Sequence, residues 1–159
     1  MNQSFTAIDF ETAHGKRWSI CAVGLVRVED GTIKEKLSLM VRPPDNIYSR
    51  YNIDIHGITP RKTANAPTFA GVWPQIEPFI TNQNVVAHSG FKFDFNVLKQ
   101  TLEYYEIVEP KYTKHCTCKI YGKDLATLCR EHRIPLNHHE ALSDALACAE
   151  LFNRHLATK

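Results

Sequence analysis

Residues 5–13, FTAIDFETA, decide what fold this chain can adopt. In an extended strand, side chains two positions apart share a face, so Asp9 and Glu11 point one way while Ile8 and Phe10 point the other. The apolar surroundings predict a central strand whose end opens at the edge of the sheet, where open α/β sheets bind ligands. Two carboxylates on such a strand indicate a functional site; a surface strand with its acids in water is the alternative.

A third carboxylate, Asp94, lies in VVAHSGFKFDFNVL, residues 85–98. There a short apolar strand passes through a glycine turn into a helical pattern of apolar residues. Acids are common at helix starts because they cap backbone N–H groups and suit the helix dipole. Taken alone, therefore, Asp94 is predicted to be a cap rather than a ligand.

A fourth carboxylate and a histidine lie in HHEALSDALACAELF, residues 138–152. Asp144 falls near the margin of the apolar stripe of an amphipathic helix, where it can face water or a cleft. His139 precedes it by five residues, which on one continuous helix would put the two about 140° apart. His139 can act with Asp144 only from the loop or first turn that leads into the helix; a solvated histidine at a helix start is the alternative.

These segments together resemble the three motifs of the DnaQ-like, or DEDDh, 3′→5′ exonuclease superfamily. The first motif is D-x-E-T at residues 9–12, the second runs from His88 to Asp94 and Leu98, and the third is H-x-A-x-x-D-A at residues 139–145. The stretch IHGITPRKTANAPTF, residues 55–69, resembles the segment that links them. The similarity extends from Phe5 to about Leu156 and is greatest to bacterial stand-alone or DNA polymerase III epsilon-like members.

The resemblance implies a site for two Mg²⁺ or Mn²⁺ ions, which prefer carboxylate oxygens. By resemblance, Asp9 would bridge the ions, Glu11 and Asp144 would complete the site that activates water, and Asp94 would hold the second ion. Two ions about 3.5–4 Å apart can address the attacking and the leaving oxygen of an in-line displacement. His139 would be the general base, because its pKa of about 6.5 suits proton transfer near neutrality.

The resemblance also names candidates for contact with the terminal nucleotide. Phe10 would stack, Thr12 would make a backbone contact, Ile58 would act as an apolar wedge, and His88 belongs to the second motif. For Phe10 and Ile58, ordinary core packing is the alternative. The neighbouring His138 lacks the five-residue separation from Asp144 and is assigned no catalytic part.

The cysteines raise a second metal-site hypothesis. His115, Cys116, Cys118, Cys129 and His132 have a spacing that a structural zinc ion would accept. Cys129 falls within a helical pattern, and free cysteines are often simply buried. Five cysteines in all, an odd number, favour reduced thiols over a disulfide framework.

Composition describes an ordinary globular chain. It has 159 residues, 43% hydrophobic and 23% charged, which predicts one domain over residues 1–159 with a substantial core. The net charge of +2 creates no bulk field that favours nucleic acid. No run approaches the ~18 apolar residues of a membrane span, and the N-terminus lacks a secretion signal, so we expect a cytoplasmic protein.

Further patterns predict the remaining elements. Two strands, RWSICAVGLVRV and TIKEKLSLMVRP, should form a hairpin around Asp30-Gly31. Segment 43–68 should be loop-rich, and a helix after Thr68 should be shortened or kinked by Pro74 and Pro78. We then expect a strand at VVAHS, a helix to about Ile107, a strand near 112–118, a helix over 122–133 and a terminal helix. The predicted fold class is α/β, with a ribonuclease H-like mixed five-stranded sheet flanked by helices.

The predicted function is a metal-dependent 3′→5′ exonuclease that releases nucleoside 5′-monophosphates from a free 3′ end. DNA is preferred to RNA as substrate, in replication, proofreading or repair, with a polymerase or repair complex as partner. An RNA-trimming exoribonuclease is one alternative. The other is a non-catalytic nucleic-acid-binding module of a replication assembly, although such a module would not need all four carboxylates and His139.

Overall fold

The computed structural model describes residues 3–159. Its elements follow one another as β1 (Phe5–Thr12), β2 (Ile20–Glu29), β3 (Thr32–Met40), the 3₁₀ turn η1 (Pro44–Asn46), α1 (Arg50–His56), α2 (Pro60–Thr63), α3 (Phe69–Ile80), β4 (Asn84–Ala87), α4 (Asp94–Tyr104), β5 (Thr113–Cys116), α5 (Thr117–Tyr121), α6 (Leu125–His132) and α7 (Ala141–Ala157). The predicted strand around Asp9 is β1.

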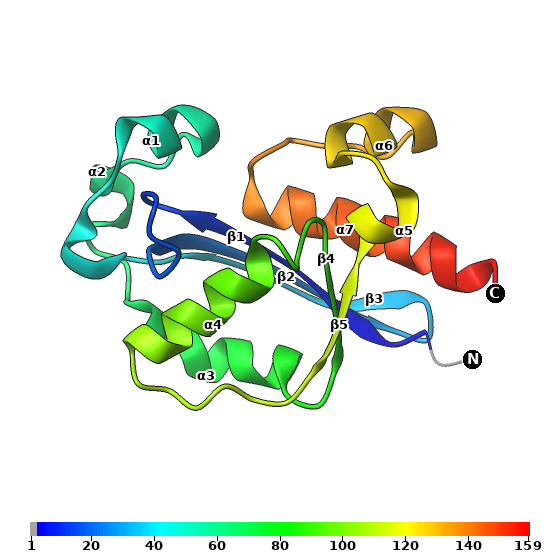
Figure 1. The fold of residues 1–159 in the computed structure, drawn as a ribbon, viewed down its shortest axis with the longest axis horizontal. Coiled ribbons are helices and arrows are strands. Elements are labelled where there is room, and N and C mark those ends of the chain that lie inside the picture. Colours follow the sequence, from blue (N-terminus) through cyan, green and yellow to red (C-terminus); the bar gives the residue numbers. More distant parts are fainter. Residues whose placement is uncertain (1–2) are drawn as a thin grey trace.

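The strands form one mixed sheet in the order β3-β2-β1-β4-β5 (Figure 1). β1 pairs antiparallel with β2 and parallel with β4, while β2–β3 is antiparallel and β4–β5 parallel. The prediction of a mixed five-stranded sheet with a central first strand is therefore confirmed. The carboxyl ends of β1, β4 and β5 lie at the same edge because these strands are parallel.

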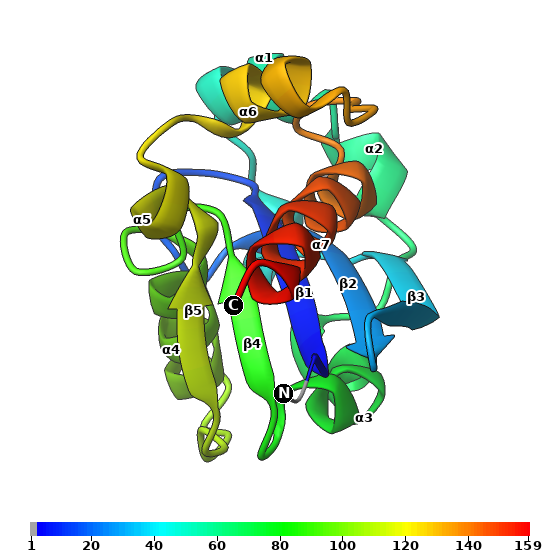
Figure 2. The same ribbon diagram turned by 90° about the vertical axis from the view of Figure 1, so that its right-hand side faces the viewer.

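Helices cover both faces of the sheet, with α3 and α4 on one side and α7 on the other (Figure 2). The alternation in β1 follows this division. Ile8 and Phe10 pack with residues of α3 and α4, whereas Phe5 and Ala7 pack with residues of α7. Asp9 and Glu11 continue the second series, so their side chains belong to the face that α7 covers.

The predicted hairpin between β2 and β3 is also confirmed. Asp30 and Gly31 both have positive φ, 49° and 80°. Two consecutive positive φ values are the mark of a type I′ turn, whose twist matches that of the flanking strands.

A close contact between Gly24 and the start of α7 sets the position of that helix. A Cβ atom on Gly24 would lie 2.4 Å from the Ala141 carbonyl carbon and 2.6 Å from the Leu142 nitrogen. Gly24 is the β2 partner of Asp9. The absence of a side chain here lets α7 begin directly over the strand pair that carries the first two carboxylates.

Segment 43–68 is more ordered than the sequence analysis predicted. It contains α1, which begins after Ser49, whose side chain accepts a hydrogen bond from the Asn52 backbone N–H, and ends at Gly57 with φ 73°. It also contains α2, with a proline at its first position. The description as loop-rich was wrong for these residues, because the prolines flank helices here instead of preventing them.

Other boundaries shift by a few residues. The helix predicted over 122–133 is α6, which begins after its cap Asp124 and ends at His132. The strand predicted near 112–118 ends at Cys116, because α5 begins at Thr117. α3 extends through both Pro74 and Pro78 over 12 residues, so these prolines do not end it early. None of the helices formed by residues 3–159 is long and apolar enough to span a membrane.

Candidate active site

A cleft of about 600 Å³ opens at the carboxyl end of β1. Its walls come from β1, α1, the β4–α4 connection with the start of α4, the segment that runs from α5 to the start of α6, and the loop before α7 with the first turn of that helix. The four carboxylates predicted from the sequence, Asp9, Glu11, Asp94 and Asp144, all line this cleft, and so does His139.

Three of the carboxylates converge on one point. Asp9 and Glu11 project from β1 beneath α7, and Asp144 lies in the first turn of α7. Each offers an oxygen within 4.8 Å of the others. Glu11 and Asp144 are 8% and 4% exposed, so the three acids share a largely dehydrated space.

Asp94 reaches the same cleft from the other face of the sheet. It is the first residue of α4, and its Oδ1 accepts a hydrogen bond from the Phe10 backbone N–H at 3.0 Å. The helix cap is Phe93, which makes no side-chain capping bond. The prediction of a simple cap was wrong, because Phe93 occupies the cap position and the 2% exposed carboxylate of Asp94 accepts a hydrogen bond from β1.

Crowding of these acids raises their pKa values. Burial, followed by the charges of the neighbouring carboxylates, raises the pKa of Asp9 well above its usual range and that of Glu11 to about 8. Burial also raises the pKa of Asp94 to about 7 and lifts that of Asp144. The site holds four groups that resist ionisation unless positive charge is supplied.

Lysine and arginine do not supply this positive charge within the described residues, where the basic group paired with these acids is His138, whose Nδ1 lies 3.1 Å from Asp144 Oδ1. No Lys or Arg of residues 3–159 forms an ion pair with Asp9, Glu11, Asp94 or Asp144. Within the same residues, the buried Oδ2 of Asp9 has no hydrogen-bond partner. Buried carboxylates of this kind fit hard divalent cations, which bind oxygen ligands and would neutralise the group.

Two histidines, His138 and His139, precede α7, and the sequence predicts a catalytic part for His139 alone. His139 is in the loop that leads into α7, as its action with Asp144 requires, and its backbone N–H donates to Asp144 Oδ2 at 3.0 Å. His138 Nδ1 lies 3.1 Å from Asp144 Oδ1, and its ring stacks on that of His139 with centroids 3.8 Å apart. Burial and the nearby His138 lower the pKa of His139.

The candidate nucleotide contacts separate into two groups. Thr12 and His88 line the cleft, and the buried Nε2 of His88 has no partner within residues 3–159. His88 Nδ1 is held by Thr117 Oγ1 at 2.8 Å. Phe10 also lines the cleft, but its side chain is buried in the core with α3 and α4. The Ile58 side chain is buried in a small cluster beside α7, so core packing accounts for both side chains.

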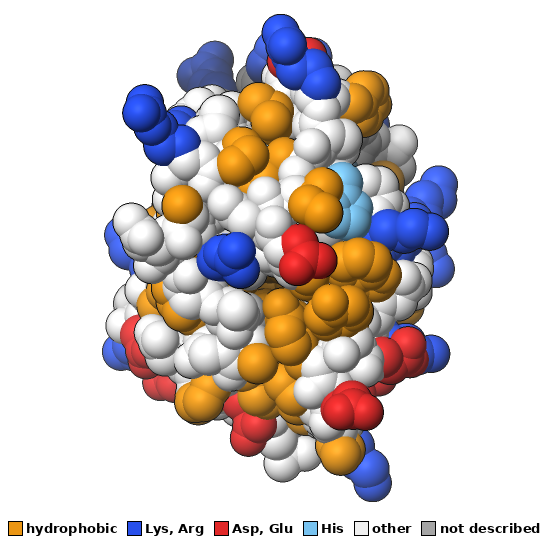
Figure 3. Space-filling view, turned by 90° about the vertical axis from the view of Figure 1, so that its left-hand side faces the viewer, with side chains coloured by type: hydrophobic (Ala, Val, Ile, Leu, Met, Phe, Trp, Pro, Cys, Tyr) orange, Lys and Arg blue, Asp and Glu red, His pale blue; other side chains and the backbone are white. Residues whose placement is uncertain are grey.

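Helix α1 supplies cleft residues that the sequence analysis missed. Tyr51 and Ile55 line the cleft and are 75% and 39% exposed. The helix is pinned to the end of β1, because the Thr12 carbonyl accepts from Asn52 Nδ2 at 3.0 Å and lies 2.9 Å from His56 Nε2. On the molecular face where α1 and α2 lie, hydrophobic side chains gather in patches among Lys, Arg, Asp and Glu (Figure 3).

The second metal hypothesis finds no support in the structure. Only two groups of His, Cys, Asp and Glu in residues 3–159 bring three ligand atoms together, and neither includes a cysteine. The five cysteines are free, and Cys116, Cys129 and Cys148 are buried. The spacing that suggested structural zinc therefore does not become a cluster in space.

Comparison with known proteins gives matches along most of the chain. The exonuclease family RNase_T matches residues 6–152. A PolC-type DNA polymerase III from Thermotoga petrophila is 26% identical over 96% of this chain, and the chain spans only 12% of that relative's length. The epsilon subunit of DNA polymerase III from Aquifex aeolicus is 27% identical, with 96% of this chain and 80% of the subunit covered.

Solved structures agree with the sequence matches. Exonuclease X in complex with 5′ overhanging duplex DNA is 26% identical, with a TM-score of 0.77, over 98% of this chain and 92% of that one. Exonuclease I in complex with a dA16 oligonucleotide superposes with a TM-score of 0.81 over 94% of this chain and 40% of that one. At 14% identity, this is a similarity of fold alone.

Proposed function

The chain belongs to the RNase_T exonuclease family, and from this premise we propose that it is a 3′→5′ exonuclease that releases nucleoside 5′-monophosphates from DNA. One observation carries the proposal: Asp9, Glu11, Asp94 and Asp144 come from three separate elements of the fold and line the same cleft. A fold without metal chemistry has no reason to bury them together.

The proposed cofactors are two Mg²⁺ or Mn²⁺ ions held by Asp9, Glu11, Asp94 and Asp144. The raised pKa values, the missing counter-charge and the partnerless Asp9 Oδ2 support a cation at this place. When bound, the ions neutralise charge at the phosphate and help to generate the nucleophile from water. Asp94 is fixed for this role by its hydrogen bond from the Phe10 backbone.

We assign the general base to His139. Its lowered pKa keeps the imidazole neutral at pH 7, the state that can take a proton from water. Its backbone N–H holds Asp144, so one loop residue positions both the base and a carboxylate.

Binding of the terminal nucleotide is assigned to the walls of the cleft. Thr12 and His88 remain candidates, and the exposed Tyr51 and Ile55 of α1 offer an aromatic ring and an apolar edge above the carboxylates. Rings of this kind stack on bases without regard to sequence. Phe10 and Ile58 enter the proposal as packing supports of β1 and of the loop before α7.

DNA is proposed as the substrate because the solved relative at 26% identity is a complex with duplex DNA. The DNA polymerase III relatives support a polymerase or repair complex as partner and the bacterial cytoplasm as location. RNA trimming and a non-catalytic binding module are the competing functions, and the complete set of carboxylates with His139 disfavours the second.

A digestion assay tests the proposal. Single-stranded DNA, duplex DNA and RNA of one sequence, each labelled at the 5′ end, are incubated with Mg²⁺, with Mn²⁺ and with chelator. We expect a ladder of shortened DNA with either metal and none with chelator. Binding that is equal with and without chelator and leaves the strands intact would favour the module, and a faster ladder on RNA would favour trimming.

A further inference from the structure

A second group of metal-binding side chains lies beside the four carboxylates. His138, His139 and Asp144 each offer one ligand atom, and these atoms lie within 4.8 Å of one another. We call these three residues the His-His-Asp trio. Asp144 belongs both to the trio and to the group with Asp9 and Glu11, so the two groups share one ligand.

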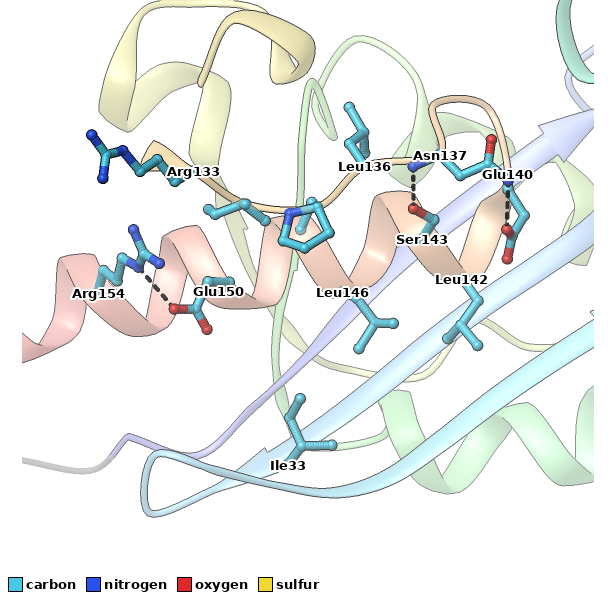
Figure 4. A pocket seen from close by; sticks show the side chains of 13 residues that line it. Ile33, Arg133, Leu136, Asn137, Glu140, Leu142, Ser143, Leu146, Glu150 and Arg154 are labelled. Carbon is cyan, nitrogen blue, oxygen red and sulfur yellow. Dashed lines mark hydrogen bonds and ion pairs between the residues drawn. The ribbon is translucent and has the colours of Figure 1, made fainter. Parts of the chain in front are cut away.

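The loop that carries the trio is held from two sides. On the cleft side, His138 Nδ1 and the His139 N–H each contact a different oxygen of Asp144, at 3.1 and 3.0 Å. On the far side, the Asn137 N–H donates to Ser143 Oγ at 2.7 Å and Asn137 Nδ2 donates to Glu140 Oε2 at 3.0 Å (Figure 4). The His138 imidazole is therefore held directly against the carboxylate, and the His139 ring lies beside it through its stack on His138.

His138 has no task in the proposed reaction. It lies outside the three family motifs, and its side chain is 40% exposed. Its exposure leaves the trio open to an ion arriving from solvent. His139 has φ 68°, a left-handed conformation that turns the loop so that consecutive rings stack instead of pointing apart.

The ligand chemistry of the trio differs from that of the four carboxylates. Mg²⁺ prefers oxygen ligands and keeps several waters, whereas imidazole nitrogens suit Zn²⁺, Co²⁺ and related ions. Two imidazoles and one carboxylate make a common zinc ligand set, with water in the fourth position. Binding of one ion would require the two stacked rings to turn out of their near-parallel arrangement, because a metal lies in the plane of each imidazole that binds it.

We propose that the His-His-Asp trio is an inhibitory site for a borderline transition-metal ion, with Zn²⁺ the expected occupant. An ion bound there would be ligated by the His139 imidazole and would pull the Asp144 carboxylate toward the loop. The inhibitory consequence rests on the proposed function, since it removes both the general base and one carboxylate. The binding of zinc itself does not depend on that function.

Spectroscopy of Co²⁺, used as a probe for Zn²⁺, tests the site without any nuclease assay. Wild-type protein should give the strong visible absorption of four-coordinate Co²⁺, which Zn²⁺ then displaces. His138→Gln should lose this absorption and bind Co²⁺ at least ~10-fold more weakly, because even indirect support of a ligand is worth about that much. The control, His132→Gln, removes an imidazole of the rejected cysteine–histidine spacing and should leave the spectrum unchanged.

A weak six-coordinate spectrum in the wild-type protein, or one that survives His138→Gln, would overturn the site. His139→Gln gives a second check, since it should also lose the absorption while both variants keep the wild-type circular dichroism. A spectrum lost with His132→Gln would place the ion elsewhere.

Inhibition is then measured at saturating Mg²⁺, with each variant scaled to its own zinc-free rate. Half-inhibition of His138→Gln should need at least ~10-fold more Zn²⁺ than that of the wild type and of His132→Gln. Equal zinc sensitivity would mean that Zn²⁺ acts at the four carboxylates, which contradicts the proposal. A protein that digests no nucleic acid but shows the His138-dependent cobalt spectrum would refute the proposed function and leave the site standing.

Discussion

Two hollows of similar size lie on opposite sides of the loop before α7, and they differ in chemistry. The cleft of about 600 Å³ contains four carboxylates, of which Glu11, Asp94 and Asp144 are buried and Asp9 is partly exposed. The groove of about 710 Å³ lies between α7, the loop before it and β3, with Ile33, Leu142 and Leu146 among its apolar walls (Figure 4). Its charged residues Glu150 and Arg154 pair with each other at the surface.

The size of a hollow alone therefore does not mark a reactive site. The larger hollow has mainly apolar walls and pairs Glu150 with Arg154, whereas the smaller one gathers carboxylates that need an outside partner. The loop before α7 separates the two hollows. Asn137 and Glu140 of this loop line the groove, whereas His138 and His139 between them line the cleft.

Replacing a carboxylate of the cleft should have the largest effect. Asp9→Asn keeps the size of the side chain but removes the charge that the proposed metals need, so we expect no DNA digestion above background. The matched change in the groove, Ile33→Ala, alters a side chain that is 46% exposed and should leave the rate within about twofold. Comparable losses in both variants, measured on labelled DNA, would erase the distinction between the two hollows.

Removing the proposed base should come next. His139→Ala should lower kcat by roughly 10²–10⁴-fold while the protein still binds DNA. Because the pKa of His139 is lowered, its neutral form persists below the ordinary value, and the wild-type rate should fall only below about pH 6.5. His155→Ala, outside both hollows, is the control; a wild-type pH profile in the His139 variant would exclude the assignment.

Replacement of Gly24, the β2 residue that lies against the start of α7, should also lower activity. Gly24→Ala forces the start of α7 away from β2, because the new Cβ would overlap the Ala141 backbone. We expect activity to fall by roughly 10–100-fold through displacement of Asp144, together with a lower melting temperature. Gly71→Ala in α3 meets only an ordinary contact at 3.5 Å and should be neutral or slightly stabilising. Equal behaviour of the two variants would show that the close contact is unimportant.

The acids of the cleft should also affect stability. A carboxyl whose pKa is raised on folding stabilises the protein below its unfolded pKa, and this contribution is lost as pH rises through the folded value. For Glu11 and Asp94, with pKa values of about 8 and 7, the window runs from about pH 4 to 8. The melting temperature of metal-free protein should fall by roughly 5–10 °C between pH 5 and 8.5.

Saturating Mn²⁺ should reduce this fall, and Asp94→Asn should weaken the pH dependence of the metal-free protein. A metal-free melting temperature that rises steadily with pH over the same range would contradict the raised pKa values.

The smallest effect should come from the rim of the cleft. Tyr51→Ala removes an exposed ring that we assign to base stacking, which contributes about 1–3 kcal/mol per base. We expect KM for DNA to rise several-fold with little change in kcat. Tyr104→Ala, an exposed tyrosine that does not line the cleft, is the matched control. Unchanged KM in the first variant would remove Tyr51 from the binding surface.

Alternation along β1 made much of this site readable from the sequence. A period of two places Asp9 and Glu11 on one face, and the structure confirms the strand and its central position. The same period places Phe10 on the opposite face, where it is buried with α3 and α4. A stacking role for that side chain conflicts with the rule that located the acids.

Other features depend on the tertiary arrangement. Asp94 reads as a cap because nothing local reveals that the Phe10 N–H, 84 residues earlier, will meet its oxygen. Helix α1 has signals at both ends, Ser49 as its N-cap and Gly57 as its C-cap. The prolines on either side of it nevertheless predict a loop. The seat of α7 on Gly24 requires knowledge of which elements pack together.

A crystal of the protein soaked with Mn²⁺ and measured by anomalous scattering would locate the metal. We expect manganese within ligand distance of Asp9, with Glu11, Asp94 and Asp144 completing its surroundings. A cleft that stays without manganese at saturating concentration, or manganese bound only in the groove, would contradict this expectation.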